Sequence, residues 1–237
     1  MAEAAPPTTG PSYQDIGSKY GVSAAQPFAG GEHLPSTAWH PEFEDVNNDG
    51  LLDLLVTKGN VQAQPDFAQK DPTNLLLGQP DGTFREAADA AGILTFDRAR
   101  GAALADLNLD GRLDLVLVSY GAPVRLWRND GAIGGAATSA NWLGLRPHQA
   151  APNVDAIGAV VEVRAGGRVD RRELTIGGGH AGGQLGWLHF GLGAADAAEV
   201  RVTWPGGEQS AWQRVTPNAF YLFERRGVPA PWPGGAE

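Results

Sequence analysis

One acidic pattern of nine residues occurs twice in this chain and restricts its fold more than any other feature. Each copy has oxygen-bearing side chains at positions 1, 3, 5 and 9 and a glycine at position 6. These oxygen-bearing residues are Asp45, Asn47, Asp49 and Asp53 in the first copy, and Asp106, Asn108, Asp110 and Asp114 in the second. Hard oxygen ligands of this kind suit Ca²⁺, which takes about six to eight of them in flexible geometry.

The glycines at position 6, Gly50 and Gly111, can adopt a positive φ at low cost. The backbone can therefore reverse and direct a carbonyl group at an ion, and we expect the carbonyl donors at position 7, Leu51 and Arg112. The pattern thus predicts two Ca²⁺ sites. The alternative is a pair of Asp/Asn/Gly turns without metal, which is disfavoured because converging carboxylates repel one another without a cation.

An EF-hand begins with the same spacing, but it also needs a glutamate at position 12 and a helix on each side. Position 12 is Val56 in the first copy and Leu117 in the second. Both residues lie in short apolar runs, 51–56 and 113–118, that are rich in strand-forming residues. Each loop is therefore expected to lead into a buried β-strand rather than a helix.

Composition limits the possible functions. The chain has 237 residues and a formal net charge of −9, which argues against a nucleic-acid partner because phosphate backbones are bound by clusters of Lys and Arg. No apolar stretch is long enough to span a membrane. There is no cysteine, which excludes disulfides, thiolate zinc sites and cysteine nucleophiles. No nucleophile–base pair is visible from spacing, so we expect a protein that is not an enzyme.

The segment 177–182 matches the dinucleotide pattern G-x-G-x-x-G, but the residues after it do not begin a helix, so we expect an ordinary loop. Within it, His180 is the best candidate among the histidines for exposed ligand contact. His189 lies in a strand-like stretch and is expected to pack or to form hydrogen bonds.

Around the acidic loops, a larger repeat of loop, strand, connection and second strand indicates propeller-type blades. The phrases 43–56, 81–84 and 90–93 carry a resemblance to the FG-GAP, or VCBS, repeats of integrin-type β-propellers. In that family the acidic loop binds Ca²⁺ on the blade, and every side-chain ligand position is filled here in both copies. The resemblance covers about residues 13–135.

The C-terminal third resembles the ASPIC/UnbV domain through the phrases 153–159, 189–193 and 204–207. In bacterial homologues of cartilage acidic protein this domain follows FG-GAP repeats. The chain departs from the family at Val154, Val160 and residues 182–184, which weakens the case for a retained ligand site.

These observations predict an all-β chain, in which two propeller-type blades precede a small antiparallel β-sandwich or barrel. We expect a mobile tail over 1–12, the two repeats over 13–135, the ASPIC/UnbV-like domain over 136–226 and a C-terminal tail over 227–237. Because two blades leave a sheet face and strand edges uncovered, we expect a protein partner or additional blades to cover them. Self-association and packing of the ASPIC/UnbV-like domain over the face are the alternatives.

The function expected from this organisation is that of a non-enzymatic calcium-binding interaction or assembly module with a protein or glycan partner. Millimolar Ca²⁺ suits such loops, which favours an extracellular, periplasmic or cell-surface location. The numbered chain opens without a recognisable signal peptide. The alternative is an accessory or catalytic role in a secondary-metabolite pathway of the enediyne type, which the UnbV resemblance permits.

Overall fold

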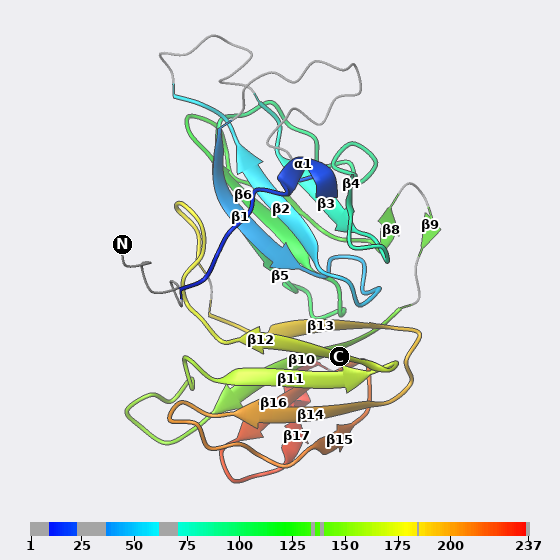
Figure 1. Cartoon of the computed structure of the whole chain (residues 1–237), viewed down its shortest axis with the longest axis vertical. Helices are drawn as coiled ribbons and strands as arrows, with labels where there is room; N and C mark the ends of the chain where they lie inside the picture. Colours follow the sequence, from blue (N-terminus) through cyan, green and yellow to red (C-terminus); the bar gives the residue numbers. More distant parts are fainter. Residues whose placement is uncertain are drawn as a thin grey trace, which may run out of the picture.

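A computed structural model describes residues 10–22, 37–61, 71–133, 136–137, 140–183 and 185–235. Two β-rich halves are stacked along the long axis of the molecule, with the N-terminal sheets in the upper half of Figure 1 and the C-terminal sheets in the lower half. The first half also carries the short helix α1 (Gly17–Tyr20). Most of the predicted mobile tail over 1–12 lies outside the described residues.

The N-terminal half consists of two antiparallel sheets that correspond to the two expected blades. The first sheet has the order β1-β2-β3-β4 and the second β5-β6-β7. Their bounds are β1 Ala38–Glu44, β2 Asp53–Lys58, β3 Asn74–Gly78, β4 Phe84–Glu86, β5 Ala99–Ala105, β6 Asp114–Ser119 and β7 Arg125–Trp127. Both apolar runs that follow the acidic loops are therefore strands, which contradicts the EF-hand alternative.

The two blades share one apolar core. Leucines on alternate strand positions, such as Leu55 and Leu75 of the first blade and Leu104 and Leu115 of the second, are buried together. The period-2 alternation of strands places these side chains on the faces that meet. The packing holds the β1–β2 and β5–β6 hairpins side by side.

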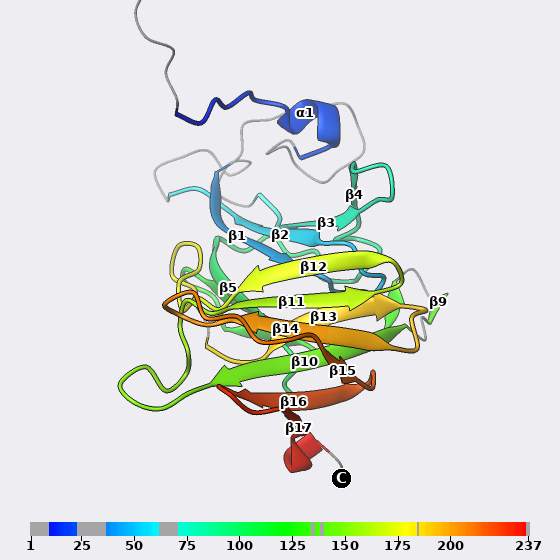
Figure 2. The ribbon, with the colours of Figure 1, turned by 60° about the horizontal axis from the view of Figure 1, so that its bottom comes forward.

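The C-terminal half is a β-sandwich. One sheet has the order β13-β10-β16-β17 and the other β12-β11-β14-β15. Their bounds are β10 Asn141–His148, β11 Val160–Ala165, β12 Arg168–Glu173, β13 Leu188–Gly193, β14 Ala198–Thr203, β15 Gln213–Val215, β16 Ala219–Glu224 and β17 Pro229–Pro231. Figure 2 shows the strands of both sheets crossing the lower half of the molecule.

The inner faces of both sheets form the core of the sandwich. Leu143, Phe190 and Phe223 from one sheet pack with Val161 and Val200 from the other, and all five are buried. The alternating apolar residues of β11 and β14 are therefore used as the sequence predicts. One pair departs from the expected antiparallel pattern, because β10 and β16 run parallel.

Small elements complete the described structure. The hairpin β8 (Ala132–Ile133) and β9 (Ala136–Ala137) links the two halves in sequence. Within the predicted C-terminal tail over 227–237, β17 pairs with β16, and the 3-10 helix η1 (Pro233–Gly235) follows it. This part of the predicted tail thus belongs to the sheet.

The prediction of an all-β fold with blades and a sandwich is confirmed. The sheets of the described residues form no closed barrel. Of the two folds expected for the C-terminal domain, a sandwich or a barrel, the structure therefore has the sandwich. Over the same residues, no helix combines the length and the apolar character that a bilayer span requires.

The shared core of the blades should be sensitive to truncation. Leu117 on β6 is 1% exposed, whereas Leu126 on the neighbouring β7 is 64% exposed. We expect Leu117→Ala to lower the free energy of unfolding by about 2–5 kcal/mol, because it removes buried methyl groups and leaves a cavity. Leu126→Ala should change it by less than about 0.5 kcal/mol. Equal losses in urea denaturation would refute the assignment of the inner face.

Candidate metal centre

Each acidic loop connects the first two strands of its blade. The first loop runs from the end of β1 to the start of β2, and the second from β5 to β6. In the strand pairing, Glu44 lies opposite Asp53 and Ala105 lies opposite Asp114. Positions 1 and 9 of each loop are therefore at the two legs of a hairpin, which brings their carboxylates to one end of the blade.

The two loops fold in the same way. In the first, the Asp45 carboxylate accepts hydrogen bonds from the backbone N–H of Asp49 at 3.1 Å and of Gly50 at 2.7 Å. In the second, Asp106 accepts from Asp110 and Gly111 at the same two distances. Both glycines have φ of +84°, as the reversal of the backbone requires.

Positions 3 and 5 lie within hydrogen-bond distance of each other in both loops. Asn47 Nδ2 donates to Asp49 Oδ2 at 2.9 Å, and Asn108 Nδ2 donates to Asp110 Oδ2 at 2.9 Å. The sequence-predicted oxygens at positions 1, 3 and 5 are thus collected around one turn in each blade.

The aspartates at position 9 connect each loop to the strands beside it. Asp53 accepts hydrogen bonds from the N–H groups of Val46 and Gly78, both at 2.9 Å. Asp114 accepts from Leu107 at 3.2 Å and from Asn129 at 2.8 Å. Because an ionised carboxylate has about four acceptor sites, these bonds leave capacity for a cation.

Position 7 differs between the loops. The Arg112 guanidinium lies 2.5 Å from Asp110 Oδ2 and also donates to the carbonyl of Asn129. Leu51 places no charge at the equivalent position of the first loop. The second loop is therefore partly neutralised by its own arginine, and the first is not.

Over the described ranges, no three Asp, Glu, His or Cys side chains converge in an arrangement that could hold a metal ion. The loop carboxylates accept backbone N–H groups instead. The chemistry of the donors nevertheless fits Ca²⁺, because each loop offers three carboxylates, an amide oxygen and backbone carbonyls.

Burial makes the first loop electrostatically costly. Asp45 is 2% exposed, and this burial, reinforced by the neighbouring Asp53 and Asp49 carboxylates, raises its pKa to about 8. Burial also raises the pKa of Asp53 to about 7. In the second loop, burial likewise raises the pKa of Asp106. A divalent cation among these oxygens would offset the repulsion.

The C-terminal half contacts both loops. Asn48, at position 4 of the first loop, is 6% exposed and has φ of +60°, a conformation that asparagine tolerates well. Its Nδ2 donates to the Gly111 carbonyl at 2.9 Å, and its Oδ1 lies 2.6 Å from Nε2 of His189. One side chain therefore joins the first loop to the second loop and to β13.

Further contacts between the halves lie at the loop glycines. Arg168 Nη1 donates to the Gly50 carbonyl at 2.6 Å, and the Trp142 indole packs against Gly111. A Cβ atom at Gly50 would overlap the Arg168 guanidinium, and one at Gly111 would overlap the Trp142 ring. The packing of the two halves therefore favours glycine at position 6 of the second loop, whereas at Gly50 the flexible end of Arg168 can move and the turn is the stronger reason for glycine.

Sequence reasoning did not identify these docking residues. His189 was expected to pack or to form hydrogen bonds, and it does both, with burial lowering its pKa to about 3. The only local signal for Asn48 is its residue type, since asparagine tolerates the positive φ that it adopts here. Leu109 adopts the same conformation at the equivalent position of the second loop. His180 is exposed as expected, in a glycine segment that forms no helix over its described residues.

The Asn48–His189 hydrogen bond should contribute to the docking of the two halves. In a double-mutant cycle of Asn48→Ala and His189→Ala, we expect a coupling energy of about 0.5–3 kcal/mol in chemical denaturation, because the two side chains are in direct contact. Additive losses would show that the pair does not couple the halves.

The buried carboxylates also predict a pH dependence in EDTA. Asp45 and Asp53 titrate near 3.8 when unfolded but at about 8 and about 7 when folded. The folded state therefore binds more protons between these limits, and stability must fall as pH rises through this window. Urea midpoints should be higher at pH 5 than at pH 8, and Asp45→Asn should reduce the difference. A midpoint that rises with pH would contradict this expectation.

Comparisons with known proteins agree with the division into two halves. The family described as FG-GAP-like repeat matches residues 45–117, and the family described as ASPIC and UnbV matches residues 149–229. Cartilage acidic protein 1 from Homo sapiens is 40% identical over 60 residues, which are 25% of this chain and 9% of that protein. The aligned region is thus a small part of the human relative.

Domains of these two families are generally non-catalytic modules of the interaction type, and they typically occur in extracellular or surface proteins. The first match contains both acidic loops, and the second contains most strands of the sandwich. The chain is therefore similar to FG-GAP-like repeats over residues 45–117 and to ASPIC/UnbV domains over residues 149–229.

Proposed function

We propose that this chain is a non-enzymatic, calcium-stabilised interaction module in which each acidic loop binds one Ca²⁺. The ligands are the oxygens of Asp45, Asn47, Asp49 and Asp53 with the Leu51 carbonyl, and of Asp106, Asn108, Asp110 and Asp114 with the Arg112 carbonyl. The observation that carries the proposal is the burial of the neighbouring Asp45 and Asp53 carboxylates, with Asp45 packed against Gly191 of β13.

The role of the metal follows from the position of the loops. The Asn48 side chain is hydrogen-bonded to His189, and the Gly50 carbonyl accepts a hydrogen bond from Arg168, so the conformation of the first loop determines how the C-terminal half is seated. Ca²⁺ bound to the folded state alone would stabilise that arrangement by ligand linkage.

The second blade supports an interaction role. On its outer face, Val118, Val124 and Leu126 are 41%, 62% and 64% exposed, and β7 pairs only with β6 among the described strands. An apolar face beside an open strand edge suits a further blade or a protein partner. A glycan partner stays within the proposal, although no described feature favours it.

The proposed location is extracellular, periplasmic or at the cell surface, where Ca²⁺ is abundant enough for loops of moderate affinity. The secondary-metabolite alternative receives no support from the matched families or from the human relative. We therefore do not propose it.

Calorimetric titration tests the metal sites. We expect Ca²⁺ to bind two sites with dissociation constants on the order of 10⁻⁴–10⁻³ M, as in extracellular modules. Ca²⁺ at about 100 times the dissociation constant should raise stability by about 2.7 kcal/mol per site, and EDTA should reverse it.

The variants Asp49→Asn and Asp110→Asn should each abolish or strongly weaken one site, since each replaces a charged ligand. Asp89→Asn changes an exposed aspartate outside the loops and serves as the control. The decisive comparison is between EDTA and about 10 mM Ca²⁺, which is on the order of ten times the weakest expected dissociation constant. The proposal fails if the wild-type chain gives no binding heat and has the same melting temperature in both.

A further inference from the structure

Over the described residues, the second blade has one strand fewer than the first. The first sheet contains β1 to β4, whereas the second contains β5, β6 and β7. Hydrogen bonds to the position-9 aspartates align the two sheets. Asp53 accepts from the N–H of Gly78 at 2.9 Å, and Asp114 accepts from the N–H of Asn129 at 2.8 Å. The segment 75–78 of β3 is therefore equivalent to the segment that ends at Asn129.

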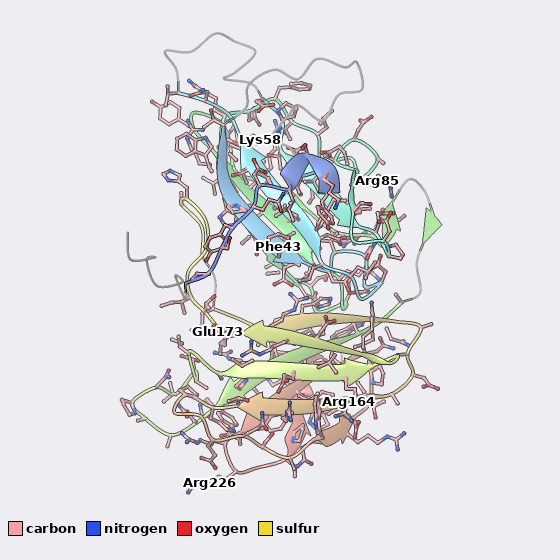
Figure 3. All side chains as sticks on the ribbon, viewed as in Figure 1. Phe43, Lys58, Arg85, Arg164, Glu173 and Arg226 are labelled. Atoms are coloured by element: carbon pink, nitrogen blue, oxygen red, sulfur yellow. The ribbon has the colours of Figure 1, made fainter. Side chains whose placement is uncertain are left out.

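In the first blade, β4 occupies the outer edge of this segment. Leu77 lies opposite Arg85, which Figure 3 labels. Farther along the same edge, the N–H of Ala87 donates to the carbonyl of Leu75 at 2.8 Å. Because the backbone groups of successive residues point to alternate edges of a strand, Leu75 and Leu77 both direct theirs toward β4.

In the second blade, the equivalent edge is open. Counting back from Asn129, Arg128 stands in the place of Leu77. Leu126 stands in the place of Leu75, and both residues of the second blade are exposed. The next strand, β8, pairs with β9 rather than with β7, and Figure 1 shows both at the right of the molecule. Among the described strands β7 pairs with β6 alone, so its outer backbone groups have no strand beside them.

A cavity of about 100 Å³ lies against the same segment. Trp127, Arg128 and Asn129 form part of its lining. Much of the rest is apolar and belongs to the core that the blades share, including Leu55, Leu75, Leu104 and Leu115. The cavity therefore continues the interface between the two blades out to the open edge. Side chains alternate along a strand, so a strand added at this edge can direct one of them into the cavity.

The first blade indicates which side chain of an added strand would enter. Phe84 of β4 packs against Phe43 of β1, with the ring centroids 6.4 Å apart. Phe43 lies opposite Leu54, and Leu104 lies opposite Leu115, each one residue past the position-9 aspartate. Leu104 is therefore the equivalent of Phe43, and it lines the cavity. A large apolar side chain in the place of Phe84 would pack against Leu104 and fill the cavity.

Charge at the edge selects the next residue of the added strand. Arg128 is exposed and, unlike Arg125, which pairs with Asp97, it forms no ion pair with a described residue. The residue across from it would stand in the place of Arg85. Opposite charges across neighbouring strands stabilise their pairing, and like charges destabilise it. An acidic residue therefore suits this position.

We propose that the edge of β7 binds an extended segment of a protein partner, which adds to the second blade as a fourth strand. The segment runs antiparallel to β7, with a large apolar side chain in the cavity and an acidic side chain opposite Arg128. Its main chain forms hydrogen bonds with Leu126 and Arg128, which supply affinity, while the cavity and the charge pair supply specificity. This inference rests on the interaction role proposed above and names the chemistry of the partner.

Calorimetry with peptides based on β4 tests the proposal. The first probe is the acetylated and amidated peptide of residues 81–88 with Arg85→Glu, and the second keeps Arg85. The third is the acidic peptide N-methylated at residues 85 and 87, which lacks the two donors that face the edge. We expect saturable binding of the acidic peptide with one site per chain, several-fold weaker binding of the second and no binding of the third. The acidic peptide should also slow amide hydrogen exchange at Leu126 and Arg128.

A charge swap locates the binding. Arg128→Glu alters an exposed side chain and should reverse the preference, so that the peptide with Arg85 binds more tightly than the acidic peptide. Arg226→Glu serves as the matched control, because its side chain is 80% exposed and lies at the lower end of the molecule in Figure 3. This control should keep the preference of the wild type. An acidic peptide that also carries Phe84→Ala should bind several-fold more weakly.

The proposal is overturned if no peptide binds saturably, if the N-methylated peptide binds as tightly as its parent, or if Arg128→Glu keeps the wild-type preference. Sedimentation without peptide should show a monomer. A dimer that Arg128→Glu dissociates would assign the edge to a second copy of the chain and would also overturn the proposal. Ca²⁺ titration without peptide separates the two proposals, since normal Ca²⁺ binding without peptide binding contradicts the strand site alone.

Discussion

The contact between buried loop carboxylates and the C-terminal half is the constraint on which the rest of the structure depends. Asp45 is almost fully buried, with Asp53 and Asp49 as its nearest anionic neighbours. Taking carboxylates out of water is expensive unless a positive charge or N–H donors compensate. The backbone of the loop supplies part of that compensation, and a bound cation supplies the rest in our account.

The same contact explains why the two halves form one unit. Asn48 reaches the second loop and His189, while Arg168 and Arg172 extend from β12 to the Gly50 carbonyl and to Glu44. Any change in the loop backbone therefore alters polar contacts made by the sandwich. A cleft beside the first loop, lined by residues of both halves, is a consequence of this docking.

Local patterns were sufficient to predict the loops, the strands that follow them and the alternating core of the sandwich, because hydrophobic periodicity and turn residues act over short distances. The contact of Asn48 with His189 could not be predicted, since it joins residues far apart in the chain and needs the orientation of the halves. The parallel pairing of β10 and β16 likewise depends on long-range packing. Gly50 was assigned to a turn, and its second role under Arg168 became visible only in three dimensions.

An anomalous difference map from crystals grown in saturating Ca²⁺ would test the account most directly. We predict two peaks, one per loop, each about 2.3–2.6 Å from oxygens of positions 1, 3, 5 and 9 and from the position-7 carbonyl. Featureless density at both loops, with the aspartates bound only to backbone N–H groups, would contradict it.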